Sequence, residues 1–240
     1  MGGIHASVMP DEASGFIYIV IIGEAEILWP KFLNDYINGN EKKLYHNEKG
    51  ISIDLEHSPV PRYDLLKNKN YFKDIRYYYN MVPVQVSRGC PHDCEFCLVT
   101  SIYGKKYRKK SIDQIKQEIN EIKKNLPGRI ILFADDNLFV NRKFAKELLG
   151  AIKELDVRWW AQSDISIAND EELLDLIYES GGLFLLIGFE SIDPENLKNM
   201  NKNAWKFKQL KDYEKNIEKI HKHGVIVFGS FIFGFDHDDT

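Results

Sequence analysis

Cysteine is scarce in this chain: its 240 residues contain three cysteines, and all three lie between residues 90 and 97. An odd number of cysteines in one short segment argues against a scaffold of paired disulfides. Structural zinc sites usually combine two short cysteine pairs separated by a longer stretch, and the sequence has no second pair. Zinc bound by the three cysteines and His92 remains open as an alternative.

Long apolar runs and a large excess of charge of one sign are also missing. The longest apolar run, Phe16 to Gly23, is well short of the ~18 residues of a membrane-spanning helix. The formal net charge is −4, so a general affinity for nucleic acid is not expected. Because 44% of the residues are hydrophobic, the chain can build a sizeable core and is not expected to be disordered.

The spacing of the three cysteines is the most informative feature that is present. Cys90, Cys94 and Cys97 lie in the segment SRGCPHDCEFC, with the spacing C-x3-C-x2-C. A 4Fe–4S cluster normally takes four thiolates, so three would leave one iron without a protein ligand. An open iron can bind a substrate or a cofactor. The spacing therefore favours a reactive iron–sulfur centre, with a structural or sensing iron–sulfur or zinc module as the non-enzymatic alternative.

Apolar strand-like runs alternate with helical patterns along the rest of the chain. A buried strand is predicted at 83–87, before the cysteines, and Ser111 is predicted to cap the helix after them. Further strands are predicted at 129–134, 157–162, 183–191 and 225–234, with helices at 143–155, 170–179 and 203–223. This alternation predicts parallel βα units in a barrel or an open doubly wound sheet.

Polar residues recur where these predicted strands end. Asp135, Asp136, Gln162 and Glu190 all stand at such positions. A single residue of this kind is more often a turn or cap residue. Parallel barrels have their active sites at the carboxyl ends of their strands. We therefore expect these four residues and the cysteine segment to line one opening there, which we call the mouth of the barrel.

A basic run, Lys105 to Lys110, contains Tyr107 and follows Tyr103. Basic residues interleaved with aromatic ones can hold RNA or a phosphorylated ligand. A solvated loop that leads into a helix is the commoner explanation, because charge runs usually lie on exposed faces. We therefore expect an exposed loop here and no clear nucleic-acid partner.

On these motifs, residues 80–240 resemble the core of the radical S-adenosylmethionine (SAM) enzymes, a partial (β/α)6 TIM-like barrel in the α/β class. The resemblance implies that the three cysteines bind a 4Fe–4S cluster, at which SAM is reductively cleaved to a 5′-deoxyadenosyl radical that abstracts hydrogen. The segment 135–137 takes the place of a Gly-Gly-Glu-type motif and departs from that consensus. The expected cofactor-binding residues are Phe96, Asp135, Asp136, Gln162, Glu190, Gly229, Phe231 and Ile232.

The start of the chain narrows the resemblance. Residues 1–58 resemble the C-terminal remnant of a Rossmann-like cobalamin-binding domain, and residues 59–79 resemble the linker that follows it in cobalamin (B12)-associated radical SAM proteins. One strand, Phe16 to Ile22, is expected before the linker. The cobalamin-ligating pattern Asp-x-His-x-x-Gly does not occur. The chain therefore resembles a fragment of a class B methyltransferase-like protein, incomplete in both domains.

The function that this resemblance implies is cobalamin-dependent C-methylation, or a related radical modification, of a small molecule or lipid. Cobalamin would be a cofactor of the full-length protein, and a flavodoxin- or ferredoxin-type partner would supply electrons. We expect a cytoplasmic protein without a transmembrane segment, peripheral to the membrane if its substrate is a lipid. An RNA or protein methylthiotransferase-like radical SAM enzyme is the alternative, although those relatives carry three further N-terminal cysteines that this chain lacks.

Overall fold

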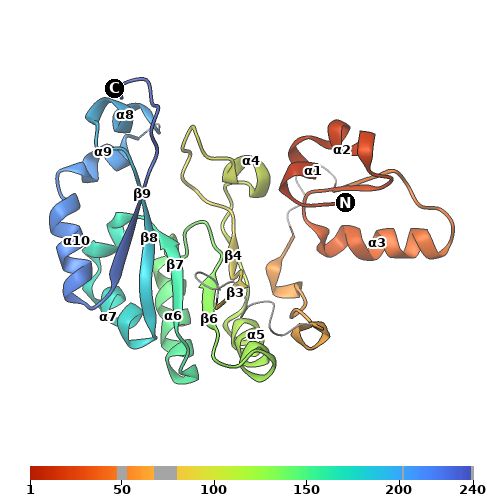
Figure 1. The fold of residues 1–240 in the computed structure, drawn as a ribbon, viewed down its shortest axis with the longest axis horizontal. Helices are drawn as coiled ribbons and strands as arrows, with labels where there is room; N and C mark the ends of the chain where they lie inside the picture. Colours follow the sequence, from red (N-terminus) through yellow and green to blue (C-terminus); the bar gives the residue numbers. More distant parts are fainter. Residues whose placement is uncertain (48–52, 68–79, 202, 239–240) are drawn as a thin grey trace.

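The computed structural model describes residues 1–47, 53–67, 80–201 and 203–238. Figure 1 shows a small N-terminal unit, residues 1–47, beside a larger unit, residues 80–238. The segment 53–67 carries two short 3₁₀ helices, η1 (Leu55–His57) and η2 (Tyr63–Leu65), and lies between the two units. No helix among the described residues is both long and apolar enough to cross a membrane.

The larger unit is built on a five-stranded sheet whose strands lie side by side in chain order. The strands are β3 (Met81–Val84), β6 (Ile130–Phe133), β7 (Trp159–Ser163), β8 (Gly182–Glu190) and β9 (Ile226–Phe231). Every neighbouring pair is parallel. Successive parallel strands joined by helices are what the alternation in the sequence predicts, so the predicted α/β architecture is confirmed.

Helices connect these strands; the longer ones lie along the sheet, and the short ones that follow β8 lie beyond its end (Figure 1). They are α5 (Ile112–Asn125), α6 (Arg142–Ile152), α7 (Glu171–Glu179), α8 (Pro194–Asn199), α9 (Trp205–Leu210) and α10 (Tyr213–Lys222), with the 3₁₀ helices η3 (Lys153–Leu155) and η4 (Ile165–Asn169). Ser111, Asn141 and Asp170 each accept a backbone N–H at the start of a helix. Ser111 is therefore the cap that the sequence predicts.

Side chains alternate between the two faces of the sheet. Phe133 and Ala161 are buried in a core that includes the apolar residues Ile119 and Leu148 of the covering helices. Residues between them, such as Trp160, point to the opposite face and are only partly buried. One face of the sheet is thus packed against helices, and the other forms the open interior of the partial barrel.

Some elements end at positions that differ from the sequence prediction. Strand β3 ends at Val84, because Val86 and Ser87 turn to donate their backbone N–H groups to the carboxylate of Asp135. The helix predicted at 143–155 ends as α6 at Ile152 and continues in the 3₁₀ helix η3. The single helix predicted at 203–223 is divided into α9 and α10.

The N-terminal unit combines helices and two short strands. Its elements are α1 (Ile4–Val8), α2 (Pro10–Phe16), β1 (Val20–Ile22), α3 (Ala25–Ile37) and β2 (Leu44–His46), with β1 and β2 parallel. The predicted strand from Phe16 to Ile22 is wrong at its start, because Pro10 at the first helical position and the acidic residues after it favour a helix that runs through Phe16. Strand β2 was not predicted, because three residues carry no readable alternation.

Candidate functional site

The three cysteines lie on a long loop, residues 89–107, that we call the cysteine loop. Its base is closed by an antiparallel pair, β4 (Ser87–Arg88) with β5 (Arg108–Lys109). Gly89 has a φ of 90°, and a Cβ atom there would come within 2.3 Å of the Lys106 carbonyl oxygen. Glycine is therefore needed where the two limbs of the loop approach each other.

The thiols are free, half-buried and close enough to influence one another. The Cys90 N–H donates to the Gly104 carbonyl at 3.3 Å, and the Cys97 N–H donates to the Cys94 carbonyl at 3.0 Å. Burial raises the pKa of the Cys90 thiol, and raises the pKa of Cys94 to about 11. The charge of Cys97 raises both pKa values further, so the three sulfurs share one neighbourhood.

This donor set suits an iron–sulfur cluster. Three thiols from one loop provide the soft ligands that iron in such clusters takes, and a metal that binds them must displace their protons. Helix α4 (Val99–Tyr103) begins two residues after Cys97. Within the part of the chain that the structure describes, no three His, Cys, Asp or Glu side chains are grouped to hold a single metal ion.

The cysteine loop is attached to the segment between α8 and α9. Cys94 forms an isolated antiparallel bridge with Asn201, and the Glu95 N–H donates to the Met200 carbonyl at 3.1 Å. The His92 ring stacks on Trp205 with ring centroids 4.5 Å apart. Sequence reasoning missed this attachment, since it joins residues about a hundred positions apart without any motif.

Asp135 lies behind the expected mouth. Its side chain is buried, with 1% of its surface exposed, and it accepts hydrogen bonds from the Val86 N–H at 3.2 Å and from both the N–H and the hydroxyl of Ser87. Burial raises the pKa of this carboxyl to about 7. Asp135 therefore holds the chain that leads into the cysteine loop, and its carboxylate is engaged there instead of being free for a cofactor.

Asp136 points the other way. It is exposed, and its charge raises the pKa of the Cys90 thiol, so it lies within electrostatic range of the cysteine loop. Partial burial of the carboxyl group itself raises the pKa of Asp136. The next residue, Asn137, turns back into the protein and donates to Asp164 at 2.8 Å. Of these neighbours, Asp136 is the carboxylate placed to meet a ligand at the cysteines.

Glu190 forms an ion pair with a lysine that sequence reasoning missed. Glu190 closes β8 in a left-handed conformation, with φ 67°, and its Oε1 lies 3.0 Å from Nζ of Lys206. Lys206 is 6% exposed and also donates to the Gly188 carbonyl at 2.5 Å. Both charges act on the pKa of Cys94, in opposite directions, which places the pair beside the cysteine loop. No sequence signal marks Lys206 among the many lysines of this region.

The remaining predicted residues are placed around the same edge. Gln162 lies on β7, on the partly buried face, and its carbonyl accepts the Leu138 N–H at 3.2 Å. Phe96 is 40% exposed, and its ring lies edge-on to Phe235 with centroids 6.4 Å apart. Both residues are therefore accessible near the carboxyl end of the sheet.

The expected residues on and just after β9, Gly229, Phe231 and Ile232, meet the site through the backbone. The Ile232 N–H donates to the Glu190 carbonyl at 2.8 Å. The Phe231 ring stacks on Phe189 at 5.4 Å, and a Cβ atom on Gly229 would come within 3.2 Å of both rings. Phe189 in turn contacts Tyr213 of α10, so the Phe231 ring lies on the helix-covered side and not in the mouth.

The basic run is only in part the exposed loop that the sequence predicts, because Lys105 and Lys106 are exposed and the rest of the run is not. Arg108 and Lys110 are buried, because β5 and the residue after it turn alternate side chains inward. Lys110 pairs with Glu118 at 2.6 Å, and Arg108 pairs with Glu24. These two cations are neutralised inside the protein, so they are not free to hold a nucleic acid.

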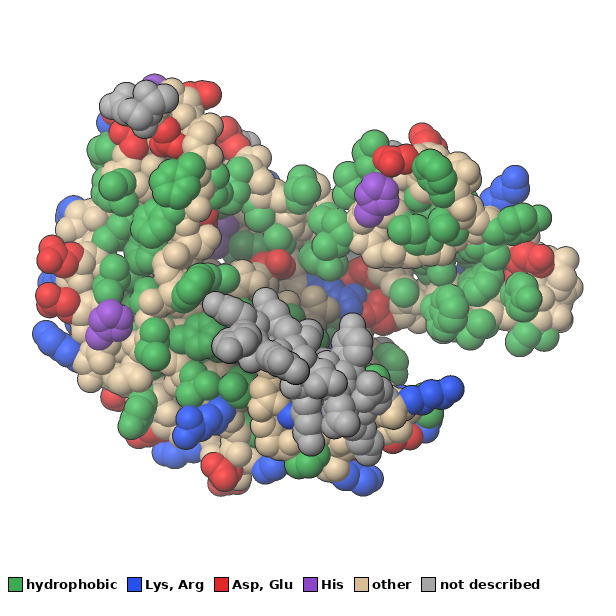
Figure 2. Space-filling model, viewed as in Figure 1, with side chains coloured by type: hydrophobic (Ala, Val, Ile, Leu, Met, Phe, Trp, Pro, Cys, Tyr) green, Lys and Arg blue, Asp and Glu red, His purple; other side chains and the backbone are tan. Residues whose placement is uncertain are grey.

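A cleft of about 690 Å³ lies between the N-terminal unit and the larger unit. The N-terminal unit contributes Gly23, Glu24 and Trp29, and the larger unit contributes Gln85, Arg88 and Tyr103. Figure 2 shows a hollow between the two units with acidic and basic side chains side by side within it. The cleft thus reaches the base of the cysteine loop.

A parallel βα sheet with three free cysteines on the loop after its first strand is the arrangement expected of an iron–sulfur enzyme of the α/β-barrel class. The model of the radical SAM superfamily matches residues 84–239. The chain therefore belongs to the radical SAM superfamily, a superfamily of enzymes whose cofactors are a 4Fe–4S cluster and SAM. The predicted partial radical SAM barrel is confirmed.

Curated relatives resemble the chain over nearly its whole length. It is 33% identical over 99% of its length to bacteriochlorophyllide d C-12(1)-methyltransferase of Chlorobaculum tepidum, covering 51% of that protein. It is 29% identical over 99% of its length to hopanoid C-2 methylase of Rhodopseudomonas palustris, covering 44% of it. The chain thus spans about half the length of the curated relatives it matches.

A solved structure shares the fold of both units. The cobalamin-dependent SAM radical enzyme OxsB, determined with aqua-cobalamin and SAM bound, superimposes with a TM-score of 0.75 at 15% sequence identity. The match covers 96% of this chain and 36% of that one. At this identity the likeness is one of fold alone.

Proposed function

We propose that the protein is a cobalamin-dependent radical SAM methyltransferase that methylates an unactivated carbon of a small molecule or lipid. The observation that carries the proposal is the cleft of about 690 Å³, which opens between the N-terminal unit and the barrel beside the base of the cysteine loop. Two relatives are named as methylating enzymes, and OxsB is described as cobalamin-dependent. The proposal includes the domain division 1–58, 59–79 and 80–240, with cobalamin in the cleft.

Each candidate residue has a role in this proposal. Cys90, Cys94 and Cys97 hold the cluster, and Asp136 receives the amino group of SAM. Gln162, Glu190 and the exposed Phe96 line the SAM site, and the β9 backbone at Gly229 and Ile232 borders it. The bound cluster and SAM supply the radical chemistry that activates a carbon–hydrogen bond, and bound methylcobalamin supplies the methyl group.

The open face of the sheet is suited to excluding water from such chemistry. Trp160 stacks on Phe184 with ring centroids 4.8 Å apart. On the same face, Leu132 is paired with Trp160 across the sheet, and Leu186 is paired with Gln162. An apolar lining keeps water and unwanted hydrogen donors away from a reactive species. In this proposal a flavodoxin- or ferredoxin-type protein donates the electrons. The burial of Arg108 and Lys110 removes two of the basic residues that would favour an RNA substrate.

Replacing Asp136 with asparagine is expected to weaken SAM binding. The change keeps the shape of the side chain and removes the charge that would pair with the SAM amino group. We expect the Kd for SAM to rise about ten-fold, the effect of one charge-assisted hydrogen bond. The measurement is equilibrium dialysis of SAM against cluster-loaded protein under anaerobic conditions. Asp113→Asn, at an exposed position in the first turn of α5, is the matched control; equal Kd values for both variants would contradict the role of Asp136.

Narrowing the cleft is expected to weaken cobalamin binding. Ala25 is exposed and lines the cleft at the start of α3, so Ala25→Phe places a ring in the space proposed for the cofactor. We expect the Kd for hydroxocobalamin to rise about ten-fold, in line with the cost of overfilling a packed site. The measurement is a spectroscopic titration of protein with hydroxocobalamin.

The control for this titration is Lys31→Phe, an added ring on the same helix at an exposed position that does not line the cleft. We expect that variant to bind hydroxocobalamin as the unmodified protein does. Absence of hydroxocobalamin binding by the unmodified protein, or equal affinity in the Ala25 variant, would contradict the proposed place of cobalamin.

A further inference from the structure

Two arginines, one partly buried and one buried, face each other at the base of the cysteine loop. Arg88 of β4 and Arg108 of β5 are paired residues of the antiparallel ribbon. Their side chains are 16% and 6% exposed. Like charges directly opposite each other on neighbouring strands destabilise the pairing, and burial makes the repulsion stronger. The base of the loop therefore needs a negative group to stay closed.

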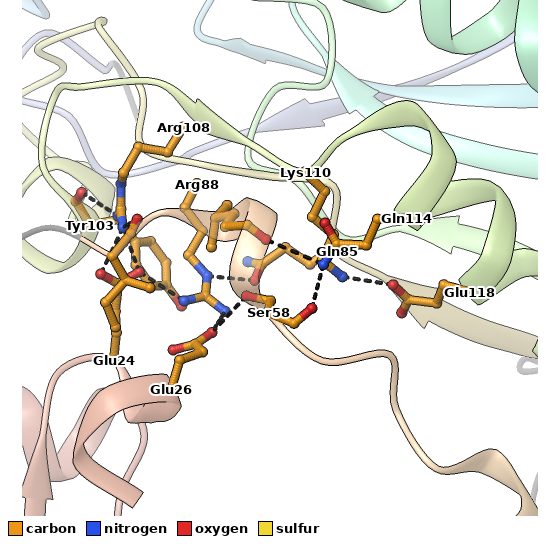
Figure 3. A network of polar contacts seen from close by, with 12 residues as sticks. Glu24, Glu26, Ser58, Gln85, Arg88, Tyr103, Arg108, Lys110, Gln114 and Glu118 are labelled. Atoms are coloured by element: carbon orange, nitrogen blue, oxygen red, sulfur yellow. Dashed lines mark hydrogen bonds and ion pairs between the residues drawn. The ribbon is translucent and has the colours of Figure 1, made fainter. Parts of the chain in front are cut away.

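Glu24 of the N-terminal unit supplies that group. Its Oε1 accepts from Nη1 of Arg88 and from Nη1 of Arg108, both at 2.8 Å, and its Oε2 lies 2.7 Å from Nη1 of Arg108. Glu26 adds a second carboxylate 2.6 Å from Nη2 of Arg88 (Figure 3). Glu24 is thus the one carboxylate among these contacts that is shared by both arginines.

The two arginines are close in the chain to both ends of the segment that contains the three cysteines. Arg88 stands two residues before Cys90, with only Gly89 between them. On the other limb, Arg108 donates through Nη2 to the carbonyl of Tyr103 at 3.1 Å, at the end of the helix that follows Cys97. A change in the ion pairs at Glu24 is therefore transmitted to both ends of the cluster-binding segment.

The ion pairs between these two arginines and Glu24 and Glu26 also form part of the cleft. Glu24, Glu26 and Arg88 all line the space of about 690 Å³ between the two units. A ligand in the cleft therefore borders the groups that hold the base of the cysteine loop. A ligand that favours the closed arrangement of these ion pairs also favours closure of the cysteine loop. By the same amount, closure of the loop favours binding of the ligand in the cleft.

We propose that Glu24 is a positioning residue that couples the N-terminal unit to the cysteine loop, so that occupation of the cleft and closure of the loop stabilise each other. The identity of the cleft ligand as a cobalamin rests on the proposed function. The closure of the loop by Glu24 rests on the ion pairs alone. The identity of the ligand and the closure of the loop can therefore be contradicted by different results of the test below.

The test measures how fast the three cysteines react with 5,5′-dithiobis(2-nitrobenzoate) in metal-free protein. Glu24→Gln keeps the shape of the side chain but leaves Arg108 without a carboxylate partner. We expect the labelling rate to rise about ten-fold or more, because breaking a buried ion pair leaves an uncompensated charge. Glu179→Gln is the matched control, since Glu179 forms a half-exposed pair with Lys153 at 2.8 Å. That control is expected to label like the unmodified protein.

A second variant separates charge balance from packing. Glu24→Gln combined with Arg108→Gln removes one charge of each sign and leaves Arg88 paired with Glu26. We expect this double variant to label more slowly than Glu24→Gln alone, whereas independent packing defects would make it faster. Glu24→Asp keeps the charge with a shorter reach and is expected to label at an intermediate rate. Circular dichroism establishes that each variant is folded.

Hydroxocobalamin is the probe of the coupling. We expect it to slow labelling of the unmodified protein and to have little effect on Glu24→Gln. Labelling of Glu24→Gln at the unmodified rate, with hydroxocobalamin still protecting the unmodified protein, would overturn the coupling and leave the proposed cofactor in place. Faster labelling of Glu24→Gln in a protein that binds no hydroxocobalamin would support the closure by Glu24 and overturn the proposed cofactor.

Discussion

Replacing Cys94 with alanine will abolish assembly of the iron–sulfur cluster. The chain has three cysteines in all, so the variant keeps two thiolates where a 4Fe–4S cluster with one open iron needs three. After anaerobic reconstitution with iron and sulfide, we expect the iron content to fall from about four per chain to near zero. Iron and sulfide analysis of the desalted protein is the measurement.

The control for the Cys94 variant lies in the same loop. Ser101→Ala changes an exposed side chain of α4 and leaves all three thiols in place. We expect that variant to take up a full complement of iron. A full four-iron complement in Cys94→Ala would contradict the assignment of the three cysteines, and zinc in place of iron would support the structural alternative.

Replacing Asp135 with alanine will destabilise the protein by about 3 kcal/mol or more, because it leaves several buried donors without an acceptor. The carboxylate of Asp135 accepts from the Val86 N–H and from two groups of Ser87 in a buried position. Urea denaturation of the metal-free protein is the measurement. The neighbouring variant Asp136→Ala is the control, and its exposed side chain is expected to contribute less than about 0.5 kcal/mol.

The pH dependence of unfolding provides a second test of Asp135. Burial raises its pKa from 3.8 to about 7, so between these values the folded chain binds more protons than the unfolded chain. The contribution of this group to stability is therefore fully present below pH 3.8 and is lost as the pH rises through about 7. Asp135→Ala should remove this dependence. Equal stability of the Asp135 and Asp136 variants at every pH would contradict the distinction between the two aspartates.

The sequence was sufficient for the class of fold and for the position of the proposed cluster ligands in the chain. Cys90, Cys94 and Cys97 are adjacent in the chain, so their spacing is readable without a structure. The alternation of apolar runs and helical patterns likewise depends on local periodicity, which is why the succession of strands and helices along the chain could be predicted.

The division of roles at the end of β6 could not be predicted. Asp135 and Asp136 are the same residue type at consecutive positions, and a shift of one residue decides which side chain faces the core. The decision depends on Val86 and Ser87, some 50 positions earlier in the chain, which supply the donors that retain Asp135. Local patterns contain no information on such a contact.

The charged residues at the base of the loop were misread for a related reason. Arg108 and Lys110 belong to a basic run, and such runs are usually exposed. Their burial is stabilised by Glu24 and Glu118, which lie 84 positions before Arg108 and 8 positions after Lys110. The Lys206–Glu190 pair beside Cys94 was missed in the same way, since neither residue belongs to a motif that marks the pairing.

The most direct test of the central claim is the formation of 5′-deoxyadenosine. The reconstituted protein is incubated without oxygen with dithionite and SAM, and the product is quantified by liquid chromatography and mass spectrometry, with Cys94→Ala as the reference. We predict that 5′-deoxyadenosine accumulates with the unmodified protein and is absent with the variant. Protein that holds a full cluster and binds SAM, yet forms no more 5′-deoxyadenosine than Cys94→Ala, would contradict the claim that this cysteine loop supports radical SAM chemistry.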